Sequence, residues 1–285
     1  MTVTQRTSLD MFRFVTIAFL VLLCLSIVVL FASDIAYLNA KAVSDVIGSE
    51  DIRYAFVLSL ITSLTTTLIA VVVSVPSAYA LSRYRFPGRT ALDVIIDLPI
   101  VIPILVIGVS ILIFFRLGSD LAESQNVILR SFGLLTAAVA EFFVYQKAGI
   151  VLAQFYCAVS FSVRTIKAAF DSIDPRTEQV ALTLGCSKAK AFWRVSLPMA
   201  RHGIAAGAVL AWARAFGIFG SIAVVAGAVR RKTEVLPTSI FLEISIGRIE
   251  TALAVSMLML TVALFILLSM RFITGGNIFG LGGRQ

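Results

Sequence analysis

Charged residues are scarce in this chain of 285 residues, where Asp, Glu, Lys and Arg together make up 14%. A soluble domain typically carries about 25%, so the composition excludes an ordinary soluble globular protein. Apolar residues instead make up 59% of the chain, and the mean hydropathy is +0.98. These values are typical of a protein that is embedded in a lipid bilayer.

Metal ligands and redox pairs are scarce as well. The chain has one histidine, His202, and three cysteines, Cys24, Cys157 and Cys186, which form no CxxC pair. This excludes a disulfide framework and a histidine- or cysteine-based metal centre. The sequence also lacks the G-x-x-x-x-G-K-[ST] loop that holds nucleotide phosphates. We therefore predict no catalytic residue, no metal and no cofactor in this chain.

Long apolar runs are what the sequence has in abundance. A helix needs about 20 apolar residues to cross the ~30 Å of hydrocarbon in a bilayer. The runs do not alternate with polar residues as the strands of a membrane barrel do. We therefore predict an all-α integral membrane protein, a single domain over residues 1–285, with six transmembrane helices at about 12–32, 54–81, 94–115, 145–163, 198–226 and 249–270.

The net charge of +8 is explained by the loops rather than by a nucleic-acid partner. Lys and Arg concentrate after the second and fourth spans, which predicts cytoplasmic N- and C-termini. The first apolar run, of about 20 residues, exceeds the 7–15 of a signal-peptide core, so we expect it to remain as a span. We expect residues 117–147 to form an outer loop with a short interfacial helix, and the glycine-rich tail, 275–283, to be a flexible cytoplasmic end.

The most informative segment is the cytoplasmic loop between spans four and five, residues 174–197. Asp174 and Pro175 predict the start of one short helix, because Asp caps helices and Pro is tolerated at the first helical position. Gly185 predicts its left-handed end, Ser187 can cap a second helix, and Pro198 opens the next span. Spacing alone leaves open an amphipathic segment that lies on the membrane surface.

The residues of this loop resemble the EAA loop of type I ABC importer permeases, the binding-protein-dependent family. The motif has an acidic residue, small residues, a glycine, then an aromatic residue and Leu-Pro. The positions that match or correspond are Glu178, Gln179, Ala181, Gly185, Phe192, Leu197 and Pro198. Gln179 and Val180 depart from the motif, which usually has Glu and Ala there.

The resemblance implies a function and a set of partners. In this family the loop docks into a cleft on a cytoplasmic ATPase, which binds ATP and Mg, and transmits its closure to the membrane spans. It implies a permease subunit in the inner membrane that is not itself an enzyme. The expected assembly is a homodimer with two ABC ATPase subunits and an extracytoplasmic substrate-binding protein, surrounded by membrane lipid and working by alternating access.

A second set of residues is similar to the molybdate, tungstate and sulfate permeases. It comprises Ala213-Arg214-Ala215-Phe216-Gly217-Ile218-Phe219-Gly220 and the later Thr233–Ile240. Those permeases usually carry Glu where this chain has Ile218. The resemblance implies a small oxyanion as the solute, with molybdate or tungstate first. The alternatives are sulfate or another small anion, and a non-transporting membrane scaffold or receptor subunit that binds an ATPase.

Polar residues within the spans are candidates for the translocation path. Ser59, Ser63 and Thr66 fall on one face of span two, where they either line a polar path or hold helices together. Gly203 and Gly207 in span five have the spacing of close helix packing.

Basic residues offer two further candidates. Arg214 lies deep in span five, where a cation is expensive; it either pairs with a carboxylate such as Asp97 or attracts an anion. Arg230, Arg231 and Lys232 form an outer basic cluster, which is either solvated or steers an anion or an acidic binding-protein surface.

Overall fold

The computed structural model describes residues 3–273, and every regular element in that range is a helix. The glycine-rich tail lies outside the described residues. The helices are α1 (Val3–Tyr37), α2 (Ala40–Gly48), α3 (Glu50–Arg83), α4 (Arg89–Val101), α5 (Ile104–Leu121), α6 (Val127–Phe143), α7 (Lys147–Asp171), α8 (Pro175–Thr183), α9 (Lys188–Ala191), the π-helix η1 (Phe192–Ser196), α10 (Leu197–Gly217), α11 (Gly220–Val225), α12 (Leu236–Ser245) and α13 (Ile249–Ile273).

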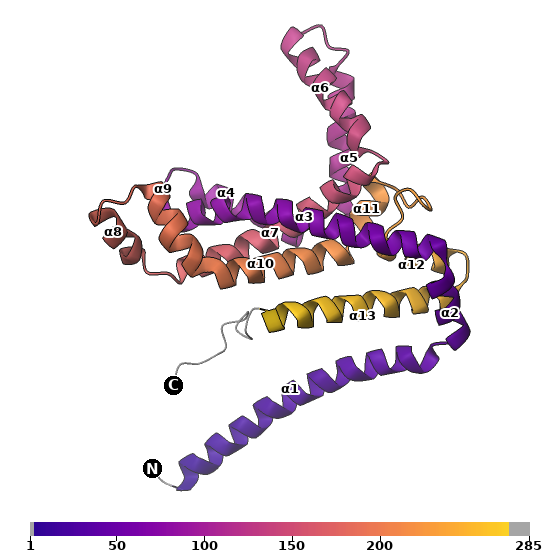
Figure 1. Ribbon diagram of the computed structural model, residues 1–285, viewed down its shortest axis with the longest axis horizontal. Helices are drawn as coiled ribbons and strands as arrows, with labels where there is room; N and C mark the ends of the chain where they lie inside the picture. The colour runs from indigo at the N-terminus through magenta and orange to yellow at the C-terminus, as the bar shows by residue number, and fades with distance from the viewer. Residues whose placement is uncertain (1–2, 274–285) are drawn as a thin grey trace.

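The centre of the molecule is a bundle in which α3, α7 and α10 run side by side, with α13 along one flank (Figure 1). Glycine allows α10 to approach α7 closely. A Cβ added to Gly203 would lie 2.0 Å from the Ala169 Cβ, and one added to Gly207 would lie 2.7 Å from Ile166 Cγ1. The prediction that these two glycines serve close helix packing is confirmed.

Five described helices are long and apolar enough to cross a membrane: Met11–Tyr37 in α1, α3, α5, α7 and Ile249–Ser269 in α13. The predicted spans 12–32, 54–81 and 249–270 lie inside α1, α3 and α13. The predicted span 145–163 corresponds to α7, which begins at Lys147 and continues to Asp171. α10 has 21 residues, enough for ~30 Å at 1.5 Å per residue.

The prediction of one continuous span over 94–115 is wrong. α4 ends at Val101, Ile102 and Pro103 are extended with ψ of 134°, and α5 starts at Ile104. Pro103 has no amide hydrogen, and its ring disfavours the helical conformation in the residue before it. The 13 residues of α4 extend ~20 Å, which is shorter than the hydrocarbon core.

The predicted span 198–226 is also divided. α10 ends at Gly217, Ile218 is extended with φ −79° and ψ 131°, and the short α11 begins at Gly220. The two helix breaks lie against each other, because a Cβ added to Gly220 would lie 3.5 Å from the backbone nitrogen of Leu105. A run of apolar residues shows that a segment is hydrophobic, but it does not show where the backbone leaves the helical conformation.

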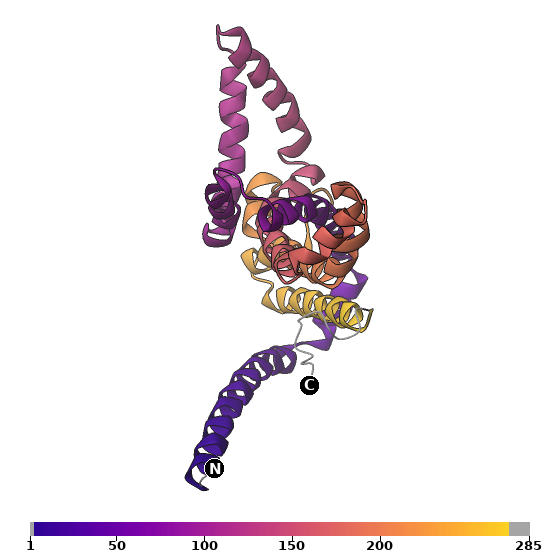
Figure 2. The same ribbon diagram turned by 90° about the vertical axis from the view of Figure 1, so that its left-hand side faces the viewer.

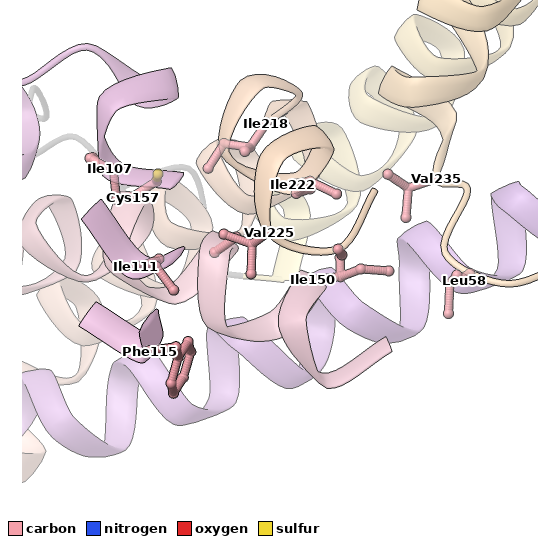
Figure 3. Close-up of a cluster of buried hydrophobic side chains, with 12 residues drawn as sticks. Leu58, Ile107, Ile111, Phe115, Ile150, Cys157, Ile218, Ile222, Val225 and Val235 are labelled. Atoms are coloured by element: carbon pink, nitrogen blue, oxygen red, sulfur yellow. The ribbon is translucent and has the colours of Figure 1, made fainter. Parts of the chain in front are cut away.

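A buried apolar cluster holds these breaks together (Figure 3). It joins Ile107 and Ile111 of α5 to Ile150 of α7 and to Ile222 of α11. Ile218, at the break after α10, is 2% exposed and belongs to the same cluster. The apolar side chain of Ile218 is therefore part of the buried interior of the subunit.

Two parts of the chain project from the bundle (Figures 1 and 2). α1 runs apart from it, and its apolar segment buries none of its residues. α5 and α6 form a hairpin that is closed tightly at two glycines: a Cβ on Gly118 would lie 2.1 Å from Thr136 Oγ1, and one on Gly133 would lie 2.1 Å from the Ala122 nitrogen. The expected loop with a short helix over 117–147 is therefore wrong, because α6 is a helix of 17 residues.

Candidate functional site

The loop of residues 174–197 has the predicted helix–glycine–helix form. The Asp174 carboxylate accepts a hydrogen bond from the Arg176 amide at 2.9 Å, and Pro175 starts α8. Gly185 ends this helix with φ +86°, and the Cys186 amide donates back to the Ala181 carbonyl at 3.0 Å. Ser187 caps α9 by accepting from the Lys190 amide at 3.3 Å.

The second helix differs from the prediction because it does not stop before span five. α9 passes into η1 and then into α10, and the linking residues Phe192 and Leu197 are helical. The Leu197 amide bonds the Phe192 carbonyl, five residues back. Pro198 explains this wider turn, since in a regular α-helix its ring would collide with the Arg194 carbonyl. The loop is therefore joined continuously to a helix of the bundle.

One side of the loop faces the bundle. Glu178 accepts hydrogen bonds from Arg83 Nε at 2.8 Å and from the Tyr79 hydroxyl at 2.9 Å. Ala181 is buried, and the Phe192 ring lies 4.7 Å from the Tyr79 ring, centroid to centroid. Burial opposes ionisation of Glu178, but the hydrogen bonds from Arg83 and Tyr79 outweigh it and hold its pKa below the ordinary value of 4.5.

The other side of the loop exposes apolar side chains. Val180 is 57% exposed and Leu184, one turn later, is 80% exposed. Trp193 is 66% exposed, and Gln179 and Pro198 are also on the surface. An apolar patch on a short polar loop is typical of a surface that another protein covers.

The hydroxyls proposed for the path lie inside the bundle. Ser59 is 1% exposed and accepts a hydrogen bond from the Leu236 amide at 2.7 Å. Thr66 donates to Gln154 Oε1 at 2.9 Å, and Gln154 in turn donates to the Ala215 carbonyl at 3.0 Å. Ser63 is fully buried and donates to the carbonyl of its own helix. This placement favours the alternative in which the hydroxyls hold helices together.

The sequence left two roles open for Arg214, and one of them was a pair with a carboxylate such as Asp97. In the structure Arg214 does not pair with Asp97. Its guanidinium lies over the Phe161 ring, 4.3 Å from the centroid, and the residue is exposed on the surface of the subunit. Asp97 is instead bound by Arg164, which also reaches Asp93 at 2.9 Å. Arg164 thereby ties α4, which buries no residue of its own, to α7.

The outer basic cluster is an ion-pair network rather than a free basic patch. Arg230 binds Glu243 at 2.6 Å and Asp51 at 3.4 Å. Arg231 binds Asp51 at 2.5 Å and also Glu50 at 3.0 Å, while Lys232 is exposed. Two of the acidic partners come from the start of α3, about 180 positions away in the sequence, and the third comes from α12, 13 positions after Arg230.

A buried acidic residue, Glu234, lies close to this network. Glu234 is 0% exposed; Ser239 donates to its Oε1 at 2.8 Å, and no described residue bonds its Oε2. Burial raises the pKa of Glu234 above its ordinary value, and the Ser239 hydrogen bond and the charge of Arg230 offset only part of this effect.

Comparison with known proteins places the chain in a transport family. Residues 70–275 match the binding-protein-dependent transport system inner membrane component. The chain belongs to this family. It is an inner-membrane, multi-pass permease of an ABC importer, and in this family ATP is hydrolysed by a separate subunit.

Curated relatives and solved structures agree with this assignment. The chain is 35% identical over 237 residues to the molybdate/tungstate transport system permease protein WtpB of Thermococcus kodakarensis, covering 83% of each chain. It is 29% identical over 225 residues to the sulfate transport system permease protein CysT of Salmonella typhimurium, covering 79% of this chain and 77% of the relative. The fold matches a bacterial alginate ABC transporter in complex with a periplasmic protein that carries an alginate pentasaccharide. That match has a TM-score of 0.69 and 20% identity, over 95% of this permease and 94% of that chain.

Sequence reasoning missed the residues that hold the loop in place. Tyr79 and Arg83 lie 99 and 95 positions before Glu178 and belong to no motif. The only available signal was their spacing of four residues near the end of an apolar span, which places both side chains on one helix face.

Proposed function

We propose that this permease carries a small oxyanion, molybdate or tungstate first, and that two copies form the pathway with two ABC ATPase subunits and an extracytoplasmic binding protein. The resemblance to molybdate/tungstate permeases supports the choice of anion. Sulfate is the second candidate, supported by the similarity to a sulfate permease. The six-span topology with both termini inside is part of this proposal.

The observation that carries the proposal is the two-sided loop. Its inner side is bonded to α3 through Glu178, and its outer side exposes Val180 and Leu184. An apolar outer side fits a cleft on an ATPase, and a bonded inner side transmits the movement of that cleft. We propose that ATP-driven closure brings two such loops together and opens the pathway outward, and that hydrolysis returns it to the inward-open state.

Arg214 remains the candidate for contact with the anion. Arg214 lies in the last turn of α10, and a cation within a membrane segment is costly unless it faces water or protein. Arg214 is exposed on the single subunit and rests on an aromatic face rather than on a carboxylate. A water-filled pathway between two copies of the subunit would hydrate the guanidinium of Arg214. Ser59, Ser63 and Thr66 are better explained as packing contacts, so we propose that the path runs along the exposed side of α10.

Uptake into proteoliposomes tests the function. The permease is reconstituted with its ATPase and binding protein, and ATP-dependent uptake of molybdate, tungstate and sulfate is measured by elemental analysis. We expect saturable molybdate or tungstate uptake that excess sulfate does not abolish. Uptake of sulfate alone would select the second candidate, and no uptake of any oxyanion would reject the proposal.

A further inference from the structure

Glu178 is held by a compact set of side chains at the cytoplasmic end of the bundle. Arg83 and Glu178 form an ion pair at 2.8 Å in which the two side chains are 9% and 13% exposed. The Tyr79 hydroxyl donates to the second carboxylate oxygen at 2.9 Å. Both oxygens of Glu178 are therefore engaged within the subunit, and the carboxylate is turned away from the exposed side of α8.

The same side chains connect four helices. Arg83 Nη2 donates to the carbonyl of Ile173, just after α7, at 2.9 Å. The Tyr79 ring lies 5.4 Å from the Phe170 ring of α7 and 4.7 Å from the Phe192 ring of η1, with steep edge-to-face angles. A single cluster thus joins α3, α7 and α8 to the helix that continues into α10.

α8 has little else to attach it. Ala181 is its one buried residue, and its large apolar side chains point outward. A helix of nine residues is marginal in isolation, because most helix stability in proteins comes from packing. The contacts of Glu178 therefore decide where α8 stands relative to the bundle.

We infer that Tyr79 and Arg83 are positioning residues for energy coupling: they fasten α8 to α3 through Glu178, so that a displacement of α8 moves the membrane helix. This inference rests on the proposed docking of the loop on an ATPase. It assigns Glu178 a partner within the permease, whereas a carboxylate that reached out to the ATPase would need no partner on α3.

The variants Arg83→Gln, Tyr79→Phe and Glu178→Gln test the inference. Arg85→Gln and Tyr84→Phe are matched controls, because both of these residues are exposed. The reconstituted importer is assayed for ATPase association by co-purification, for ATP hydrolysis, and for molybdate imported per ATP hydrolysed. Tyr79→Phe keeps the aromatic packing and removes only the hydroxyl, so it remains informative if a charge variant fails to fold.

We expect Arg83→Gln and Glu178→Gln each to lower the molybdate imported per ATP on the order of tenfold, as for the loss of a charge-assisted hydrogen bond. Tyr79→Phe is expected to have a smaller effect, and ATPase association and both controls to be unchanged. The double variant Arg83→Gln/Glu178→Gln should import about as much molybdate per ATP as either single variant. Each single variant and the double variant remove the same contact between Arg83 and Glu178.

Other outcomes overturn the inference. If Glu178→Gln alone abolishes ATPase association while Arg83→Gln and Tyr79→Phe behave as wild type, Glu178 contacts the ATPase and not α3. Unchanged import per ATP in all three variants also overturns it. A separate variant, Leu184→Arg on the exposed side of α8, tests the docking itself: normal ATPase association there would reject the proposed function of the loop.

Discussion

Replacement of Gly185 separates the shape of the loop from its contacts. Gly185 has φ +86°, and nothing lies within 4 Å of the position that a Cβ would take. A substitution therefore meets no neighbour, and the whole effect is the backbone strain of a left-handed residue. That strain is ~1–2 kcal/mol for an ordinary residue. It is less for Asn, which tolerates this conformation, and more for the β-branched Val.

A graded series follows from this reasoning. Asn, Ala and Val at position 185 should weaken the binding of the ATPase increasingly, with about 5- to 30-fold for Ala if the strain shifts the loop out of its docking conformation. The assay is ATPase binding to detergent-solubilised permease, followed by uptake. Gly48→Ala is the control, because Gly48 also has open space around it but no positive φ.

The order of the three variants decides the matter. If Asn weakens binding as much as Val, the effect comes from the new side chain and not from the backbone. Wild-type binding in all three variants would refute the idea that the left-handed turn sets the shape of the docking surface.

Three further predictions concern packing and charge. Gly203→Ala should lower the apparent unfolding temperature, because overpacking costs about 1–3 kcal/mol of stability. Ala169→Gly in the same chain should restore it, because the new Cβ at position 203 would collide with the Ala169 Cβ; failure of the rescue would contradict the close approach of the two helices. Glu234→Gln should raise the unfolding temperature at pH 8 and change it little at pH 4, because a raised pKa makes ionisation destabilising above about 4.5; a lower unfolding temperature at pH 8 would contradict this. Arg230→Gln should destabilise the protein by about 1–3 kcal/mol, because the buried Glu243 Oε1 loses its hydrogen bond, whereas Lys232→Gln should have little effect; equal decreases in unfolding temperature for the two variants would contradict the network.

Apolar content and local signals made much of the fold predictable. Runs of about 20 apolar residues located α1, α3, α7 and α13, and the Asp174, Gly185 and Ser187 signals gave the details of the loop. Each of these features depends on residues that are close in sequence. The break at Pro103 was visible in principle, since proline disfavours the helix before it, but the hydrophobicity around it suggested continuity.

What the sequence did not reveal depends on pairs that are far apart. Arg83 meets Glu178 and Arg164 meets Asp97 only because α3, α4, α7 and α8 come together in space. The hydroxyls of span two were correctly placed on one helix face, but whether that face met water or protein was decided by the position of Gln154 on α7.

The outer cluster shows how such pairing changes a functional argument. Arg230, Arg231 and Lys232 as a sequence suggest a positive field at the mouth of a pathway, which would attract an anion and weaken with salt. In the structure Asp51 and Glu243 neutralise much of that field at 2.5–3.4 Å. The network instead fastens the start of α3 to the segment before α12, at the opposite end of α3 from Arg83. α3 is thus bonded at both ends by arginine–carboxylate pairs, Arg231 with Asp51 at its start and Arg83 with Glu178 at its end.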